Sequence, residues 1–170
     1  MADRPTPSTN PPAAPVPSAG AAGPEAGWSP FAPDARRPWN ESLAGHLLRR
    51  AAFGASAADL RRAVGAGPEA AVASLLRPPA DADAFHREQD GYEKAGSSAR
   101  PLPELRGWWL RRMMLTPHPL LERMTLFWHG YFGVGSTDPD LALAHVRTLR
   151  KHALGRFDEL LKAVLRDPAA

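Results

Sequence analysis

Apolar residues recur every three or four positions along most of the chain after residue 40, which is the spacing of one face of an α-helix. A clear example is the series Leu105, Trp108, Trp109 and Met113, and another is the run from Leu120 to Tyr131. The predicted helices cover residues 41–53, 56–65, 68–77, 103–115, 119–131, 139–154 and 157–166.

Residues that cap helices stand at several of the predicted helix starts. Asn40 precedes the first apolar stripe, where an asparagine side chain accepts a hydrogen bond from the first helical turn. Ser56 and Asp59 have the spacing of a capping box, in which side chains and backbone bond reciprocally. Asp138 before Pro139 suits an N-cap followed by the first helical residue.

Residues 79–101 interrupt the helical pattern, because this stretch is rich in Asp, Gly and Ser. We predict a loop here, with one helical turn around Phe85–Gln89. No part of the chain shows the sustained apolar and polar alternation of a strand, and isoleucine is absent. The predicted fold class is all-α, an irregular multi-helix bundle.

Residues 1–38 differ in composition from the rest of the chain. They hold ten of the 19 prolines, and Ala, Gly and Ser fill most of the other positions. Such a stretch buries too little apolar surface to offset the chain entropy lost on folding. We predict a disordered arm, rich in Pro and Ala, over residues 1–38 and a helical domain over residues 39–170.

Composition argues against several classes of protein. The chain has no cysteine, which excludes a disulfide framework and any thiolate site. The net charge of +3 is too small to indicate a nucleic-acid partner. The first residues lack the apolar segment of a secretory signal, and nothing approaches the roughly 20 apolar residues of a membrane span. We expect no membrane span and, by default, a cytoplasmic chain.

The Trp-rich helices indicate an incomplete core. They present more apolar surface than the short helices before residue 78 can cover. An exposed apolar patch of this kind marks a contact with another protein surface. We therefore expect a protein partner or a missing C-terminal segment to cover it, with residues 39–170 forming the N-terminal part of a larger domain.

Several segments resemble the opening blocks of one bacterial family. They are HLLRRAAFG (His46–Gly54), WWLRRMMLTPHPLLERMTLFWHGYF (Trp108–Phe132), RTLRKHALGRF (Arg147–Phe157) and RDP (Arg166–Pro168). In sequence, order and spacing they are similar to the domain-of-unknown-function family 1800, over residues 40–168. Members of that family are several hundred residues long and uncharacterised. The resemblance therefore implies the first part of a longer protein and supplies no mechanism.

His129 is the strongest candidate for a catalytic residue. It follows Trp128 near the end of an apolar helix, and a histidine in a cleft can act as a general acid or base. The competing interpretation is structural, because the helix dipole favours a protonated histidine near a C-terminus. His129 and His152 are also the candidate metal ligands. No histidine pair has the i, i+4 spacing of helical zinc ligands, so the metal and any other cofactor stay unknown.

The other histidines have weaker functional interpretations. His118, Glu122 and His129 could form a line of polar groups along one helix, although Pro119 disfavours helical geometry at His118. His145 flanks an apolar stripe, as His152 does, and we expect both to pack or to form hydrogen bonds.

Arginine pairs at 49/50, 61/62 and 111/112 are expected at the surface, mostly solvated or in ion pairs. Two hypotheses about function remain. The first is a structural or interaction module. The alternative is the N-terminal portion of an enzyme, such as a metal-dependent hydrolase, that a missing C-terminal chain would complete.

Overall fold

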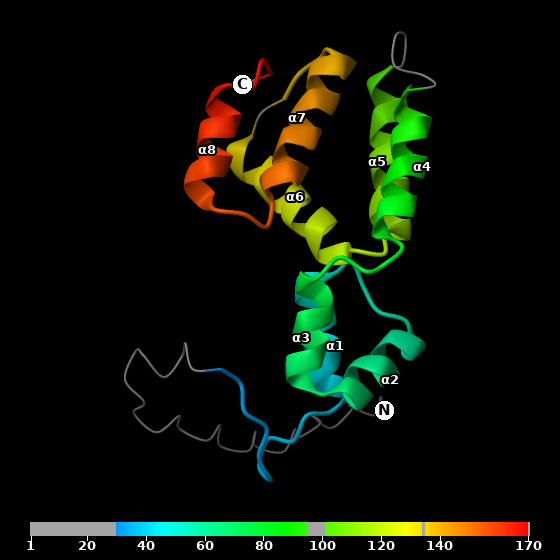
Figure 1. The fold of residues 1–170 in the computed structure, drawn as a ribbon, viewed down its shortest axis with the longest axis vertical. Helices are drawn as coiled ribbons and strands as arrows, with labels where there is room; N and C mark the ends of the chain where they lie inside the picture. The colour runs from blue at the N-terminus through cyan, green and yellow to red at the C-terminus, as the bar shows by residue number, and fades with distance from the viewer. Residues whose placement is uncertain (1–29, 95–100, 134, 170) are drawn as a thin grey trace, which may run out of the picture. The chain divides into compact units, whose positions relative to one another are not determined.

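The computed structural model describes residues 30–94, 101–133 and 135–169. These residues form helices and contain no strand, so the predicted all-α class is confirmed (Figure 1). The helices are α1 (Glu41–Ala51), α2 (Ala57–Ala66), α3 (Pro68–Leu76), α4 (Ala82–Lys94), α5 (Leu102–Leu115), α6 (Pro119–Phe132), α7 (Pro139–His152) and α8 (Phe157–Leu165). None of them, within the described residues, is long and apolar enough to cross a bilayer. Most of the predicted arm lies outside the described residues.

The caps predicted from the sequence are present. The Asn40 side chain accepts a hydrogen bond from the Leu43 backbone N–H at 3.1 Å. Ser56 Oγ accepts from the Asp59 N–H at 3.2 Å, and the Asp59 carboxylate accepts from the Ser56 N–H at 2.8 Å. The capping box is therefore complete. Asp138 Oδ1 accepts from the backbone N–H groups two and three residues later, at the start of α7.

The helical turn predicted around Phe85–Gln89 is part of a longer helix, α4 (Ala82–Lys94), so the prediction of a loop over residues 79–101 is wrong for the rest of that helix. Ala82 and Gln89 of this helix are buried, and the Phe85 ring packs against an arginine guanidinium of α5. These three positions lie on one helical face. The periodicity was weak because alanine and glutamine occupy buried positions that large apolar residues usually fill.

The helices α1, α2 and α3 enclose a hydrophobic core. Its buried members are Ala44, Ala63 and Ala71, and packed against them are Trp39, Leu47, Leu48, Leu60 and Val64. Trp39 also donates a hydrogen bond from Nε1 to the Ala63 carbonyl at 3.0 Å, which fixes the residue before the Asn40 cap against α2. This core belongs to a compact unit that covers Pro33–Ala170.

A second hydrophobic core lies where α6, α7 and α8 meet. Leu149, Leu160 and Val164 are buried in it, and Trp128 and Phe132 of α6 pack against them. Trp128 donates a hydrogen bond from Nε1 to the Ala153 carbonyl at 3.1 Å. The tryptophan thus covers the core with its ring while its polar edge is satisfied, which fixes α6 against the end of α7.

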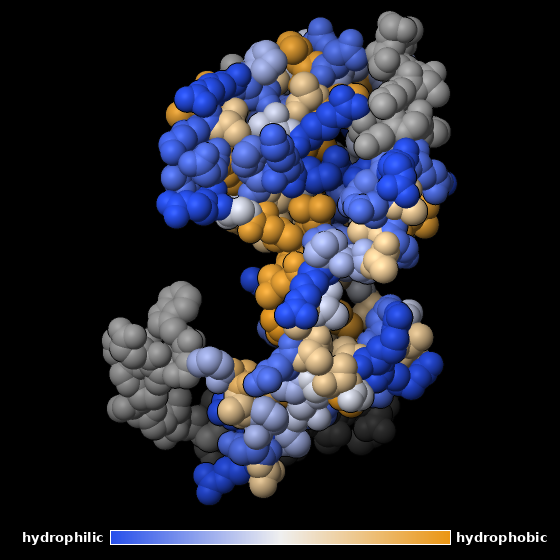
Figure 2. Space-filling model, in the orientation of Figure 1, coloured by the Kyte–Doolittle hydropathy of each residue, from blue (hydrophilic) through white to orange (hydrophobic). Residues whose placement is uncertain are grey.

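Part of the apolar surface of α6 and α8 is exposed. The residues that form this α6–α8 apolar surface are Phe127, Tyr131, Phe157, Leu161 and Leu165. Ring contacts link the two helices through Trp128, whose ring centre lies 4.9 Å from that of Phe127 and 5.6 Å from that of Phe157. Leu154 in the turn between α7 and α8 is exposed as well, and Figure 2 shows hydrophobic residues gathered around that turn.

Candidate functional site

The first of two buried polar clusters joins α5, α6 and α7. Arg112 Nε donates to Glu122 Oε1 at 2.9 Å, Arg150 Nε donates to the same oxygen at 2.8 Å, and Arg150 Nη2 donates to Oε2 at 3.0 Å. The side chains of Arg112 and Glu122 are 2% and 0% exposed. We call these three residues the Arg–Glu–Arg cluster.

Glu122 is held as a carboxylate in this cluster. Burial alone would raise the pKa of its carboxyl, but the hydrogen bonds and positive charges of Arg150 and Arg112 outweigh burial and lower it. Both guanidinium groups also lie 5.8 Å from the ring centre of Trp108. His86 Nδ1 of α4 contacts Arg112 Nη2. The cluster therefore connects four helices and leaves Glu122 no role as a proton donor at neutral pH.

Arg112 corrects the expectation that the arginine pairs lie at the surface. Arg111 is exposed, whereas Arg112 is among the most buried side chains of the described residues. Consecutive helical residues point about 100° apart, so one of the pair faces solvent while the other faces Glu122. Arg112 follows Trp108 by four residues, and a charged residue on a tryptophan stripe was the available signal for a buried partner.

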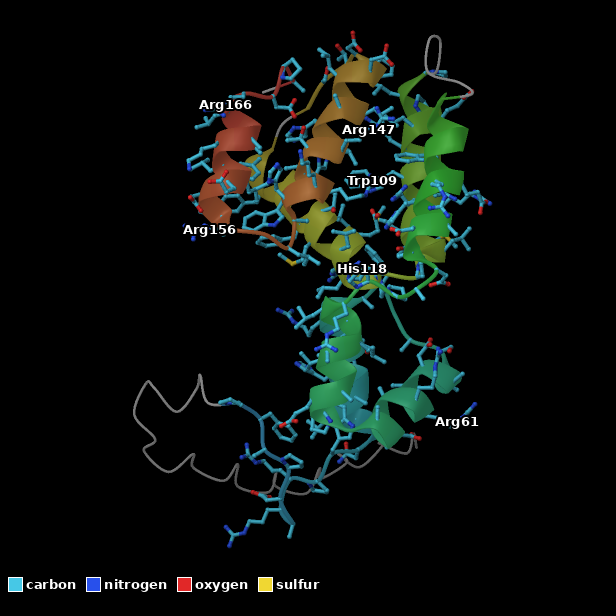
Figure 3. The ribbon with its side chains drawn as sticks, viewed as in Figure 1. Arg61, Trp109, His118, Arg147, Arg156 and Arg166 are labelled. Atoms are coloured by element: carbon cyan, nitrogen blue, oxygen red, sulfur yellow. The ribbon has the colours of Figure 1, made fainter. Side chains whose placement is uncertain are left out.

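The structure does not form the predicted line of His118, Glu122 and His129. Glu122 is occupied by the two arginines. His118 Nε2 instead donates to the Leu75 carbonyl at 3.0 Å, and Figure 3 shows His118 where the turn before α6 meets α3. His118 thus links helices and lies apart from the second polar cluster.

The second cluster contains Trp109 of α5, His129 of α6 and His145 of α7. The His129 ring lies 5.1 Å from the Trp109 ring, edge to face, and 6.0 Å from the His145 ring. His145 is only 1% exposed. Figure 3 shows Trp109 in the space between α5 and α7. We call these residues the Trp–His–His cluster.

Asp167, just after α8, adds a buried carboxylate to this cluster. Its Oδ2 lies 3.4 Å from His145 Nδ1. This distance allows an ion pair, but the geometry is not that of a hydrogen bond, and neither atom has a hydrogen-bond partner among the described residues. A carboxylate beside an imidazole can orient the ring and stabilise its protonated form.

A cavity of about 130 Å³ adjoins the Trp–His–His cluster. Its apolar walls include Leu102, Leu105 and Val146, and its polar walls include Arg106 together with the three cluster residues. Among the described residues, Trp109 Nε1, His129 Nδ1 and both ring nitrogens of His145 are buried without a hydrogen-bond partner. Buried polar atoms in proteins are nearly always paired, so this concentration at one cavity is unusual.

Burial lowers the pKa of His129, and the neighbouring His145 lowers it further. The helix dipole would shift the pKa in the opposite direction. The lowered pKa favours the neutral ring over the cation that the helix dipole would stabilise at the end of α6. A neutral imidazole can accept a proton or a hydrogen bond, which is the state that a general base requires. The catalytic role of His129 stays a prediction.

The predicted metal ligands His129 and His152 are not brought together with further ligands. The described residues contain no group of three or more His, Asp or Glu side chains arranged to hold a metal ion. The histidine beside His129 is His145, and His152 is not among the residues that line the cavity. Metal binding by His129 and His152 remains an untested prediction.

Sequence comparison places these features in a family. The family described as "Protein of unknown function (DUF1800)" matches residues 46–170, a stretch that contains both polar clusters and the α6–α8 apolar surface. No curated protein and no solved structure matches the chain. The resemblance inferred from the sequence blocks is thereby confirmed, and the chain belongs to the DUF1800 family.

Proposed function

We propose that the chain is a helical interaction module whose α6–α8 apolar surface binds a helix of a protein partner. The observation that carries the proposal is the exposure of Phe157, Leu161 and Leu165, spaced four residues apart along α8. Such a stripe is the feature by which one amphipathic helix packs against another. Phe127 and Tyr131 of α6 widen it, and their stacked rings lie 6.2 Å apart.

The rest of α8 supports this assignment. Leu160 and Val164 are buried in the core, and each precedes an exposed leucine of the stripe, so a partner helix would extend the existing core. The polar face of α8 carries Lys162, which forms ion pairs with two carboxylates of the first turn. Because this face is solvated, a partner that binds α8 gains most free energy by covering the apolar stripe. Covering one leucine side chain contributes about 1.5–3 kcal/mol.

Site-specific photo-crosslinking in cells that carry the native gene tests the interaction. A benzophenone side chain at Leu161 should give one discrete adduct with another protein, because this position points into the proposed contact. The same group at Glu159, on the solvated face of α8, is the control. No adduct from Leu161, or equal labelling from both positions, would refute the proposal. An adduct within the same polypeptide would assign the surface to its own C-terminal segment.

One observation favours an enzyme as the second candidate. Asp167 lies 3.4 Å from His145, and the His129 ring lies next to His145 at a cavity wall. This is a chemically competent arrangement for general acid or base catalysis of hydrolysis. The test is a panel of ester, amide and phosphate substrates with His129→Ala beside the wild type. Loss of hydrolysis at an unchanged melting temperature supports the enzyme; a wild type inactive on the whole panel rejects hydrolysis of these substrates.

A further inference from the structure

Several polar side-chain atoms around the cavity beside the Trp–His–His cluster form no hydrogen bond with the described residues. Trp109 Nε1, His129 Nδ1 and the two nitrogens of His145 are buried and unpaired among the described residues. His145 is 1% exposed, so bulk water does not satisfy it. Each such atom is destabilising relative to its paired state. The lining is therefore arranged for a polar molecule that enters the cavity.

The chemistry of the lining selects a ligand that accepts hydrogen bonds. A tryptophan indole can only donate, and so can an arginine guanidinium. Trp109 and Arg106, both on α5, line the cavity. A neutral histidine supplies one further donor on each ring. Asp167 lies on the Nδ1 side of His145 and favours the proton at that atom, which leaves His145 Nε2 as an acceptor, so His129 is the histidine that can donate to the ligand.

The size and the apolar walls limit the rest of the ligand. The cavity has a volume of about 130 Å³. An engineered protein cavity of roughly 150 Å³ holds a benzene molecule. Leu102, Leu105 and Val146 offer hydrocarbon contacts to whatever part of the ligand carries no charge. A single acidic group on a short aliphatic or aromatic body fits these limits, whereas nucleotides and sugar phosphates are too large.

We propose that this cavity binds a small monocarboxylate, with its carboxylate oxygens at Trp109, Arg106 and His129 and its hydrocarbon part against the leucines and valine. The site lies between α5, α6 and α7 and does not depend on the α6–α8 apolar surface. A metal ion is a poorer occupant, because the described residues contain no group of three suitable ligands.

Titration of the full chain with butyrate and benzoate tests the site, with butanamide and benzamide as neutral probes of matched shape. Saturation-transfer NMR detects the contact, and tryptophan fluorescence gives the dissociation constant. We expect at least one of the two carboxylates to bind with a dissociation constant of about 1 mM or tighter. Its amide should bind at least about tenfold more weakly, because it lacks the charge that strengthens hydrogen bonds.

Two variants locate the binding. Arg106→Gln removes a charge from a mostly exposed residue, and Trp109→Phe removes the indole N–H while keeping an aromatic ring. Each should weaken binding about tenfold or more. The matched control is Arg111→Gln, an exposed arginine on the same helix that does not line the cavity. Circular dichroism verifies that each variant folds, and Arg106→Gln keeps the test decisive even where Trp109→Phe does not fold.

Three results would overturn the proposal. The first is the absence of any carboxylate binding up to roughly 10 mM, which would leave ordered water as the occupant. The second is equal affinity for a carboxylate and its amide. The third is binding that Arg106→Gln and Arg111→Gln weaken to the same extent, since that would indicate an unspecific attraction to positive charge.

Discussion

Arg150 Nε lies 2.8 Å from Glu122 Oε1, although 28 residues separate the two along the chain. Arg112 donates to the same oxygen from a third helix. Removing charges from water costs several kcal/mol for each ion, and pairing offsets this only while every partner is present. The packing of α6 on α7 therefore depends on the Glu122 carboxylate, because without it the guanidinium group of Arg150 loses its partner.

Replacement of Glu122 by glutamine should strongly destabilise the fold. Glu122→Gln preserves size but leaves Arg112 and Arg150 facing a neutral amide. Loss of one partner from a buried ion pair costs about 3–5 kcal/mol. Urea unfolding followed by far-ultraviolet circular dichroism measures the change. Asp158→Asn, in an exposed ion pair of α8, serves as the control and should leave stability unchanged. Equal unfolding midpoints for the two variants would contradict a structural role for the cluster.

Stability should also fall in acid through Glu122. Its pKa lies below the ordinary value of 4.5 because the arginine interactions outweigh burial. The unfolded state therefore binds the proton more readily, so the contribution is fully present above about pH 4.5 and is lost as pH falls through the folded-state pKa. Free energies of unfolding at several pH values should decline over this range in the wild type and less steeply in Glu122→Gln. If the unfolding free energies of the wild type and of Glu122→Gln fell equally steeply with pH, Glu122 would not be the source of the acid sensitivity.

The capping box of α2 predicts a smaller effect that stays local. Ser56→Ala removes the hydroxyl that accepts from the Asp59 N–H and should cost about 1 kcal/mol. The loss should appear as a lower urea midpoint. Ser42→Ala, inside α1 and exposed, is the matched control and should not lower the midpoint, because alanine is the better helix former. A destabilisation as large for Ser42→Ala would argue against a capping effect.

Local signals in the sequence were sufficient for most helices and caps. Asn40, Ser56 and Asp138 bond to backbone groups within one helical turn, so their hydrogen bonds can be predicted from residues adjacent in the sequence. Only one turn of α4, around Phe85–Gln89, was predicted, because the buried face of this helix carries Ala82 and Gln89 in place of large apolar residues. A periodicity analysis detects a helix by the hydrophobicity of its buried positions. In α4 two of the buried positions hold a small or a polar residue, so the signal is weak.

The polar clusters could be predicted only in part. His129 was singled out as a residue, but its partner His145 lies on the next helix, and Asp167 is further still along the chain. Arg150 stands 28 residues from Glu122, and no spacing rule links positions on different helices. Such pairings arise from tertiary packing. The sequence signal available was a charge placed on an apolar stripe, which indicates a buried partner and does not name it.

The pKa of His129 tests the geometry of the Trp–His–His cluster. Burial, and then His145, lower its pKa below the ordinary 6.5. Of the nearby charged groups, Arg106 of α5 lines the cavity and Asp167 lies beside His145. NMR titration of the ring protons should place the His129 pKa below the ordinary value of 6.5.

The same shift links folding to pH near neutrality. The unfolded chain takes up a proton at about the ordinary pKa of 6.5, whereas folded His129 takes it up only at lower pH. Stability is therefore fully present above about pH 6.5 and is lost as pH falls through the folded-state pKa of His129. His129→Gln should flatten the dependence of the unfolding free energy on pH in this window. A His129 pKa at or above 6.5 would mean that the ring is solvated or paired in solution, and the arrangement of unpaired nitrogens around the cavity would then be wrong.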